Sequence, residues 1–136
     1  MSANKVQKLI KEKEIEFVDL RFTDPKGKLQ HVTMDKNIVD DEMLNEGIFF
    51  DGSSIAGWKA INESDMILKP DLERQVIDPF TSHNTLVLFC DVLDAVKKNP
   101  YERDPRSTAK KAENYLKKSG IGDKAYFGPE AEFFVF

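Results

Sequence analysis

Two glutamates near the end of the chain have the spacing that most directly predicts chemistry. Glu130 and Glu132 lie two positions apart in the run GPEAEFF, residues 128–134. In a β-strand alternate residues point to the same face, so these carboxylates would lie side by side, with Cα atoms about 7 Å apart. Phenylalanines on both sides of the pair favour a buried strand.

Two unpaired carboxylates on a buried face would repel each other and would lose their hydration. A divalent cation removes both costs, and an all-oxygen ligand set suits Mg²⁺ or Mn²⁺ rather than zinc. The sequence therefore supports a metal site at Glu130 and Glu132. The alternative is a strand at a sheet edge, with both side chains in water.

The segment DGSSIAGW, residues 51–58, is a second candidate. It is rich in loop-forming residues yet contains Trp58, and a long loop that holds a tryptophan is more often functional than idle. Asp51 could bind a cation or act as a base, with Gly52 permitting a tight turn. A solvated surface turn is the alternative. The segment lacks the Gly-Lys-Ser/Thr of a phosphate-binding loop.

The remaining reactive residues predict no site of their own. His31 has polar neighbours in an expected strand, and His83 lies in a turn-like segment, so both are interpreted as surface residues. Cys90 is interpreted as a small core residue, because nothing electropositive flanks it to activate a thiolate. One cysteine forms no internal disulfide, and the sequence has no CxxC pair for zinc.

The elements that must position these residues follow from periodicity and turn signals. The sequence predicts helices over residues 2–13 and 39–45, and strands over 16–23, 29–34, 66–68, 75–77 and 85–91. The first two strands form a hairpin around a DPKG turn. The last strand is apolar on both faces and is therefore expected at the centre of the sheet.

A second unit is predicted to begin after a polar linker. Asp104 followed by proline is typical of a helix start, and Gly120 of its end. Residues 125–136 are expected to form a final strand that stops on the apolar run FFVF, so we expect that the chain is truncated. The prediction is an α+β fold, with a complete small domain over residues 1–103 and the start of a larger one over 104–136.

Composition excludes several classes of protein. The 136 residues include 20 Lys and Arg and 24 Asp and Glu, for a net charge of −4, so there is no basic footprint for nucleic acid. The longest apolar run, Leu86–Cys90, is far shorter than the roughly 20 residues that span a bilayer. The amino-terminal residues show no apolar signal segment, so we expect a cytoplasmic protein with no membrane partner.

Taken in order, five segments resemble the amino-terminal part of the bacterial type I glutamine synthetases. They are FVDLRFTD (17–24), FDGSSI (50–55) with GW (57–58) and NESDM (62–66), DPF (78–80), RDPRS (103–107) and FGPEAEFF (127–134). The resemblance covers the whole chain. It implies a β-grasp domain followed by the first helix and first strand of the catalytic domain.

The resemblance implies ATP-dependent ligation of ammonia to glutamate through a γ-glutamyl phosphate. It assigns Glu130 and Glu132 as ligands of active-site Mg²⁺ or Mn²⁺. It assigns Asp51 as the aspartate that binds ammonium and assists its deprotonation, with Ser54 nearby. Residues that bind ATP and glutamate in this family would lie beyond Phe136, so the 136-residue chain alone is predicted to be inactive.

The same resemblance implies a homo-oligomer of two stacked hexameric rings, with each active site between two subunits. The Asp51 loop of one subunit would then serve its neighbour's catalytic domain. Two other functions remain open from sequence. One is a stand-alone β-grasp module that co-assembles with a full-length synthetase or regulates it, and the other is a simple Mg²⁺ or Mn²⁺ binder. An exposed apolar end also predicts self-association.

Overall fold

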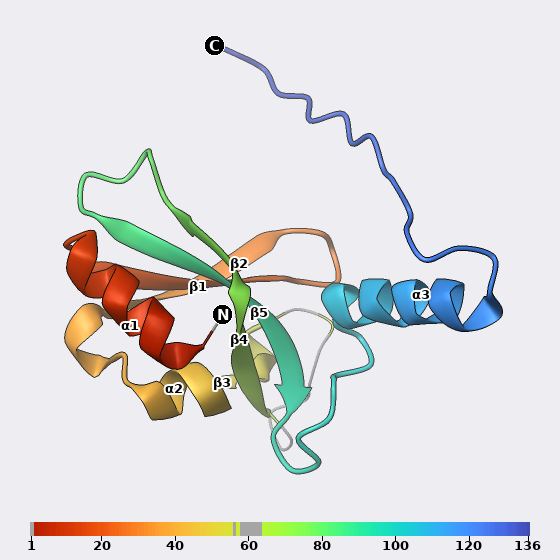
Figure 1. The fold of residues 1–136 in the computed structure, drawn as a ribbon, viewed down its shortest axis with the longest axis horizontal. Helices are drawn as coiled ribbons and strands as arrows, with labels where there is room; N and C mark the ends of the chain where they lie inside the picture. The colour runs from red at the N-terminus through yellow and green to blue at the C-terminus, as the bar shows by residue number, and fades with distance from the viewer. Residues whose placement is uncertain (1, 56, 58–63) are drawn as a thin grey trace.

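The computed structural model describes residues 2–55, 57 and 64–136. A five-stranded mixed sheet in the order β2-β1-β5-β4-β3 carries two helices on one face, and a third helix lies beside the sheet (Figure 1). The elements are α1 (Ala3–Glu12), β1 (Phe17–Thr23), β2 (Leu29–Asp35), η1 (Lys36–Ile38), α2 (Asp41–Glu46), β3 (Ile48–Asp51), η2 (Gly52–Ser54), β4 (Asp65–Ile77), β5 (Thr85–Asp94) and α3 (Pro105–Ser119).

The β1–β2 hairpin forms where the sequence predicts it. Val18, Leu20 and Phe22 alternate along β1 and are all buried. The connecting turn is closed by Asp24, whose carboxylate accepts hydrogen bonds from the backbone amides of residues 26 and 28, each at 2.9 Å. Gly27 completes the turn with a φ of 87°, a conformation in which glycine has no steric cost.

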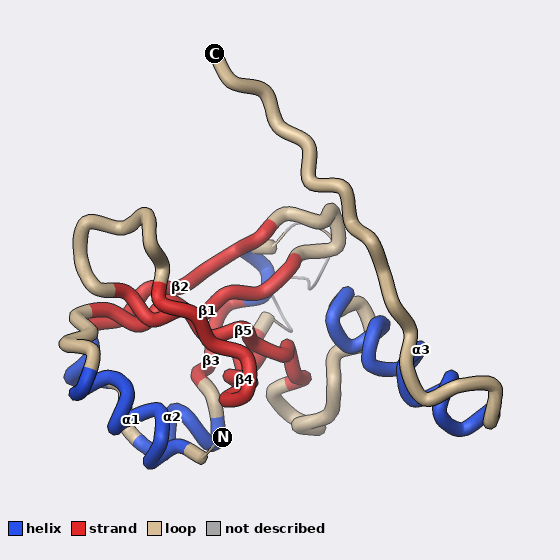
Figure 2. The backbone as a smooth tube through the Cα atoms, turned by 45° about the horizontal axis from the view of Figure 1, so that its top comes forward, coloured by secondary structure: helices blue, strands red, loops and turns tan. Residues whose placement is uncertain are grey.

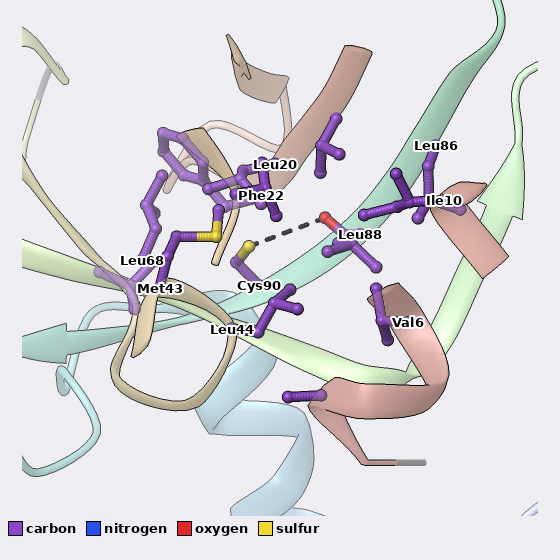
Figure 3. Packing of buried hydrophobic residues seen from close by; sticks show 14 of the residues in the cluster. Val6, Ile10, Leu20, Phe22, Met43, Leu44, Leu68, Leu86, Leu88 and Cys90 are labelled. Atoms are coloured by element: carbon purple, nitrogen blue, oxygen red, sulfur yellow. Dashed lines mark hydrogen bonds between the residues drawn. The ribbon is translucent and has the colours of Figure 1, made fainter. Parts of the chain in front are cut away.

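Strand β5 lies at the centre of the sheet, as its two apolar faces predict. It pairs in parallel with β1 and antiparallel with β4. Leu86, Leu88 and Cys90 point to the face covered by α1 and α2, where Val6 of α1 and Leu44 of α2 pack against them (Figure 3). Cys90 is a core residue, and its burial raises the pKa of the thiol.

The two strands predicted over residues 66–68 and 75–77 are one long strand, β4. Pro70 pairs with Cys90 and Gln75 pairs with Leu88, so β4 takes five residue steps where β5 takes two. The extra residues form a bulge. A proline suits this place because it cannot donate a hydrogen bond to the ladder. The bulge interrupts the alternation from which strands are predicted, which explains the difference.

Helix α3 begins and ends at the predicted residues. The Asp104 side chain accepts hydrogen bonds from the amides of Arg106 and Ser107, and Gly120 closes the helix with a φ of 72°. Beyond it the prediction of a strand over residues 125–136 is wrong for this chain, since the segment runs outward without a pairing partner (Figure 2). A strand needs hydrogen bonds from a neighbouring strand, and the alternating pattern of a segment does not show whether such a strand is present.

Within the described ranges, no helix is both long enough and apolar enough to cross a membrane.

Candidate functional site

Asp51 lies at the point where β3 ends and the short helical turn η2 begins. Its Oδ1 accepts hydrogen bonds from the Ser53 amide at 2.8 Å and from the Ser53 hydroxyl at 2.6 Å. The side chain is exposed, as is that of Ser54 on the same turn. The turn therefore presents a carboxylate to solvent in a fixed orientation.

Close packing fixes the backbone of this turn. Gly52 is buried, and its amide donates to the carbonyl of Ser64 at 2.7 Å. A Cβ added at Gly52 would lie 2.3 Å from Sδ and 2.8 Å from Cγ of Met66, which is itself fully buried. A larger residue would therefore force the Met66 side chain or the turn to shift. The hydrogen bond between Gly52 and Ser64 holds the two ends of the segment 52–64 together beside the β3–β4 pair.

The electrostatics of the turn favour an ionised carboxylate. Hydrogen bonds from the Ser53 hydroxyl, the Ser53 amide and the Ser64 side chain hold the pKa of Asp51 below its ordinary value. An aspartate is already ionised at neutral pH, and these hydrogen bonds stabilise the anion further, so Asp51 can attract a small cation and accept a proton from it. Trp58, on which the prediction of a functional loop partly depends, lies outside the described residues, as do residues 56 and 59–63.

Glu130 and Glu132 lie on the exposed segment that follows α3. The prediction that phenylalanines bury this pair is wrong for this chain, because Phe127 and Phe133 are 87% and 83% exposed. The segment makes no strand contacts that would enclose the carboxylates. Desolvation, the physical basis for predicting a metal from the sequence alone, therefore does not operate here.

The two glutamates have the right chemistry for a hard cation but make an incomplete ligand set. Carboxylate oxygens suit Mg²⁺ and Mn²⁺. Among the described residues, however, no group of three or more His, Cys, Asp or Glu side chains could hold a metal ion. Any site at Glu130 and Glu132 needs further ligands from outside this part of the chain.

The structure does not bring Asp51 and the glutamate pair together. Asp51 ends the edge strand β3, whereas the glutamate segment leaves the molecule from the far end of α3 (Figures 1 and 2). In both views this segment runs outward from the end of α3 and lies apart from β3. The two candidate sites are therefore separate within one chain.

Sequence reasoning missed a buried polar cluster on the sheet face opposite α1 and α2. Asp19, 3% exposed, accepts hydrogen bonds from Arg21 Nε at 2.7 Å and Thr33 Oγ1 at 2.8 Å, and its Oδ1 lies 2.8 Å from His31 Nδ1. Arg21 also donates to Asp78 at 2.5 Å. In the β1–β2 pairing, Asp19 lies opposite Thr33 and Arg21 lies opposite His31. The alternation of residues along the predicted hairpin was therefore the signal that could have placed these polar side chains on one face.

The histidines match their interpretation as surface residues. His31 is exposed although it reaches the Asp19 cluster, and His83 is exposed with its Nδ1 3.2 Å from a Glu16 carboxylate oxygen. His31 contacts Asp19, whereas His83 contacts Glu16, so the two histidines do not form a common site.

Comparison with known families accounts for both parts of the chain. Residues 14–95 match a family model described as the β-grasp domain of glutamine synthetase, and residues 102–136 match one described as its catalytic domain. The sheet with its helices is thus a β-grasp domain, followed by the first part of a catalytic domain. The chain belongs to the glutamine synthetase family.

Curated relatives agree over nearly the whole chain. The chain is 66% identical over 135 residues to the glutamine synthetase of Rhizobium meliloti, covering 99% of this chain and 29% of that protein. It is 56% identical over 136 residues to that of Escherichia coli, covering 100% of this chain and again 29% of the relative. The chain therefore spans under a third of the length of these relatives, and what it matches is their amino-terminal part.

A solved structure supports the fold. The glutamine synthetase of Plasmodium falciparum superimposes with a TM-score of 0.77 at 24% identity, covering 88% of this chain and 23% of the other.

Proposed function

We propose that this chain is the amino-terminal part of an ATP-dependent glutamate–ammonia ligase. The observation that carries the proposal is the identity of 56–66% to glutamine synthetases over nearly all 136 residues. We further propose that residues 1–103 are its β-grasp domain and that residues 104–136 begin its catalytic domain. On this proposal the chain alone forms no glutamine, because no group of three or more potential metal ligands exists among its described residues and the remaining ligands would come from the rest of the enzyme.

Asp51 is the proposed ammonium-binding residue. Its exposed carboxylate is ionised at neutral pH, and hydrogen bonds from Ser53 and Ser64 stabilise the anion. An ionised carboxylate attracts ammonium, and as a base within hydrogen-bonding reach it can take the proton that ammonium must lose before the nitrogen attacks. Ser54, exposed on the same turn, is proposed to lie beside the bound ammonium.

Glu130 and Glu132 are proposed ligands of Mg²⁺ or Mn²⁺. A divalent ion bound there would neutralise charge on ATP phosphate oxygens during transfer to the glutamate carboxylate. The glutamates themselves supply oxygens from one extended segment, which leaves most coordination positions to other residues and to substrates.

The separation of the two candidate sites supports an active site shared between subunits. Because Asp51 and the glutamate segment lie apart in one chain, Asp51 would meet the glutamates of a neighbouring subunit. We propose the arrangement implied by the family resemblance, a dodecamer of two hexameric rings. ATP and glutamate as substrates imply a cytoplasmic location.

A chimeric enzyme tests the proposal directly. Residues 1–136 of this chain replace the matching stretch of the Escherichia coli glutamine synthetase, to which they are 56% identical. Glutamine formation from glutamate, ammonium and ATP is then measured. We expect an active chimera, and we expect Asp51→Asn to lower kcat/KM for ammonium by about 10²–10⁴-fold, the usual contribution of a positioned base.

Matched variants separate the two sites. Glu130→Gln is expected to raise the Mn²⁺ concentration that gives half-maximal activity by at least about 10-fold, because loss of even an outer-shell partner of a metal site costs roughly that much. Asp41→Asn in α2 and Asp123→Asn after α3 remove exposed carboxylates elsewhere and should change neither quantity. An assembled but inactive chimera, or full activity in Asp51→Asn, would overturn the corresponding assignment.

A further inference from the structure

Helix α3 is attached to the sheet almost entirely through its first two turns. Ser107 is the one buried residue among the 15 of the helix, whose residues are all described. Its apolar residues Ala109, Ala112 and Tyr115 are exposed, and half-buried Leu116 lies near Gly122 in the segment that follows the helix. The direction of α3 therefore cannot be set by apolar packing along its length, and another interaction must set it.

Arg106 supplies that interaction by contacting two strands at once. Its Nε donates to Asp91 Oδ1 on β5 at 2.8 Å, and its Nη2 donates to Asp71 Oδ2 in the β4 bulge. Lys110, one turn further along the same helix face, donates to the other Asp91 oxygen at 2.5 Å. A planar guanidinium holds two acceptors in fixed directions, which a single ammonium cannot do.

The β4 bulge explains how two aspartates on neighbouring strands reach one arginine. Asp71 directly follows Pro70, where the regular ladder with β5 is interrupted. Its Oδ1 accepts a hydrogen bond from the Glu73 amide at 3.0 Å, so the bulge backbone fixes the carboxylate. Bulges turn side chains away from the regular pleat. Here Asp71 is turned toward α3, where its other oxygen meets Arg106.

The start of α3 is fixed separately. Tyr101 is buried, and its amide donates to the Val92 carbonyl at 2.9 Å, which ties the preceding segment to β5. Asp104 is fully buried and caps the helix through the amides of Arg106 and Ser107. With the first turn fixed in place, contacts of Arg106 to two strands are sufficient to define the direction of the helix axis.

We propose that Arg106 is a positioning residue, which sets the direction in which α3 leaves the β-grasp sheet by bridging Asp71 and Asp91. The segment that carries Glu130 and Glu132 follows α3 directly, so the bridge also sets the position from which that segment departs. The proposal that Arg106 orients α3 does not depend on the proposed enzymatic function. The expected effect of this orientation on metal binding by Glu130 and Glu132 rests on that function.

Distance measurements between two spin labels test the orientation. Labels at Lys11→Cys on α1 and Lys118→Cys near the end of α3 occupy exposed sites, while buried Cys90 stays unlabelled. With the labelled chain diluted in an excess of unlabelled chain, so that self-association adds no distances between molecules, the parent should give one narrow distance distribution by pulsed electron resonance. Arg106→Gln and Asp71→Asn should each lose that narrow peak, with helix content by circular dichroism unchanged.

Asp71→Asn guards against a folding artefact, because an asparagine oxygen can still accept from the Glu73 amide. Lys111→Gln removes an exposed charge from the same helix and should leave the distribution narrow. A narrow parent-like distribution in Arg106→Gln or Asp71→Asn would overturn the proposal. So would equal broadening in Lys111→Gln, because then any loss of charge on α3 would be sufficient.

The chimeric enzyme tests the consequence for the metal ligands. Arg106→Gln should raise the Mn²⁺ concentration for half-maximal activity and leave the KM for ammonium unchanged, whereas Lys111→Gln should alter neither. A change in the KM for ammonium alone would contradict the link to the glutamates. If the chimera is inactive while the spin-label result holds, the proposed function fails and the orienting role of Arg106 stands.

Discussion

Asp51 and Asp19 are both aspartates on the sheet, but their surroundings give them different roles. Asp51 is exposed at a strand end and accepts hydrogen bonds from Ser53 and Ser64, while its carboxylate stays accessible to a cation. Asp19 is buried and is surrounded by donors from both strands of the hairpin. The first arrangement suits binding, and the second suits holding two strands together.

The pKa of Asp51 should depend on Ser53. Ser53→Ala removes the 2.6 Å hydroxyl hydrogen bond, which is the largest cause of the lowered pKa. We expect the pKa of Asp51 to rise toward its ordinary value of 3.8, measured by NMR titration of the side-chain carboxyl carbon. Ser54→Ala, on the same turn, should leave the titration unchanged. An unaltered pKa in Ser53→Ala would contradict this account.

The Asp19 cluster should make stability depend on pH at the acid end. Burial raises the pKa of Asp19, but hydrogen bonds from Arg21, His31 and Thr33 outweigh it, so the pKa lies below its ordinary value. A carboxyl group with a lowered folded-state pKa stabilises the protein above its unfolded-state pKa. That contribution is lost as pH falls through the folded-state pKa, below about 3.8.

Asp19→Asn should therefore cost about 1–3 kcal/mol at pH 7, the typical penalty for disrupting a buried hydrogen-bonded group. The cost should shrink as the pH falls below 4. Urea denaturation at pH 7 and pH 3 gives both free energies of unfolding. Asp41→Asn, at an exposed helical position, is the matched control. A cost that is equal at both pH values would show that the charge of Asp19 is not what stabilises the hairpin.

At the scale of elements, the turn η2 depends on one close approach to β4. Gly52→Ala places a Cβ against Met66 Sδ and 3.0 Å from the Ser64 carbonyl oxygen, so the buried Met66 side chain or the turn must shift. Overpacking of this kind costs about 1–3 kcal/mol, measured by thermal or urea unfolding. Gly122→Ala, where the nearest atom lies at an ordinary 3.6 Å, should change stability by less than about 0.5 kcal/mol. Equal effects would refute the packing argument.

The elements also show what sequence periodicity can predict. The β1–β2 hairpin was predictable because alternation, a strong turn and local pairing agree over residues 16–34. Strand β4 was not, because its bulge breaks the alternation at residues 71–74. The turn at Asp51 was predictable from residue types, and its hydrogen bonds from Ser53 are local, whereas the hydrogen bond from Ser64 depends on how β3 and β4 pair. The strand predicted over residues 125–136 does not form. An alternating pattern indicates which side chains share a face, but it does not show which strand would pair with the segment.

At the scale of the whole molecule, the chain combines a packed domain with an extended apolar segment. The rings of Phe134 and Phe136 lie 6.2 Å apart, and both are exposed. A contiguous exposed apolar segment of this kind commonly marks an interaction site. In the glutamine synthetase relatives the matched region is 29% of a longer protein, so there is more chain against which such a segment can pack.

The 136-residue chain by itself should therefore self-associate through this segment. Burying Phe133, Phe134 and Phe136 against another copy removes apolar surface from water, at roughly 25 cal/mol per Å². Light scattering coupled to gel filtration should show a mass that rises with concentration. Phe133→Ser combined with Phe134→Ser should restore the monomer mass, whereas Phe80→Ser, which removes a phenylalanine that is 93% exposed elsewhere, should not. A monomer mass for the parent chain at every concentration would contradict this reading of the segment, because its apolar side chains would then be stable in water without a partner.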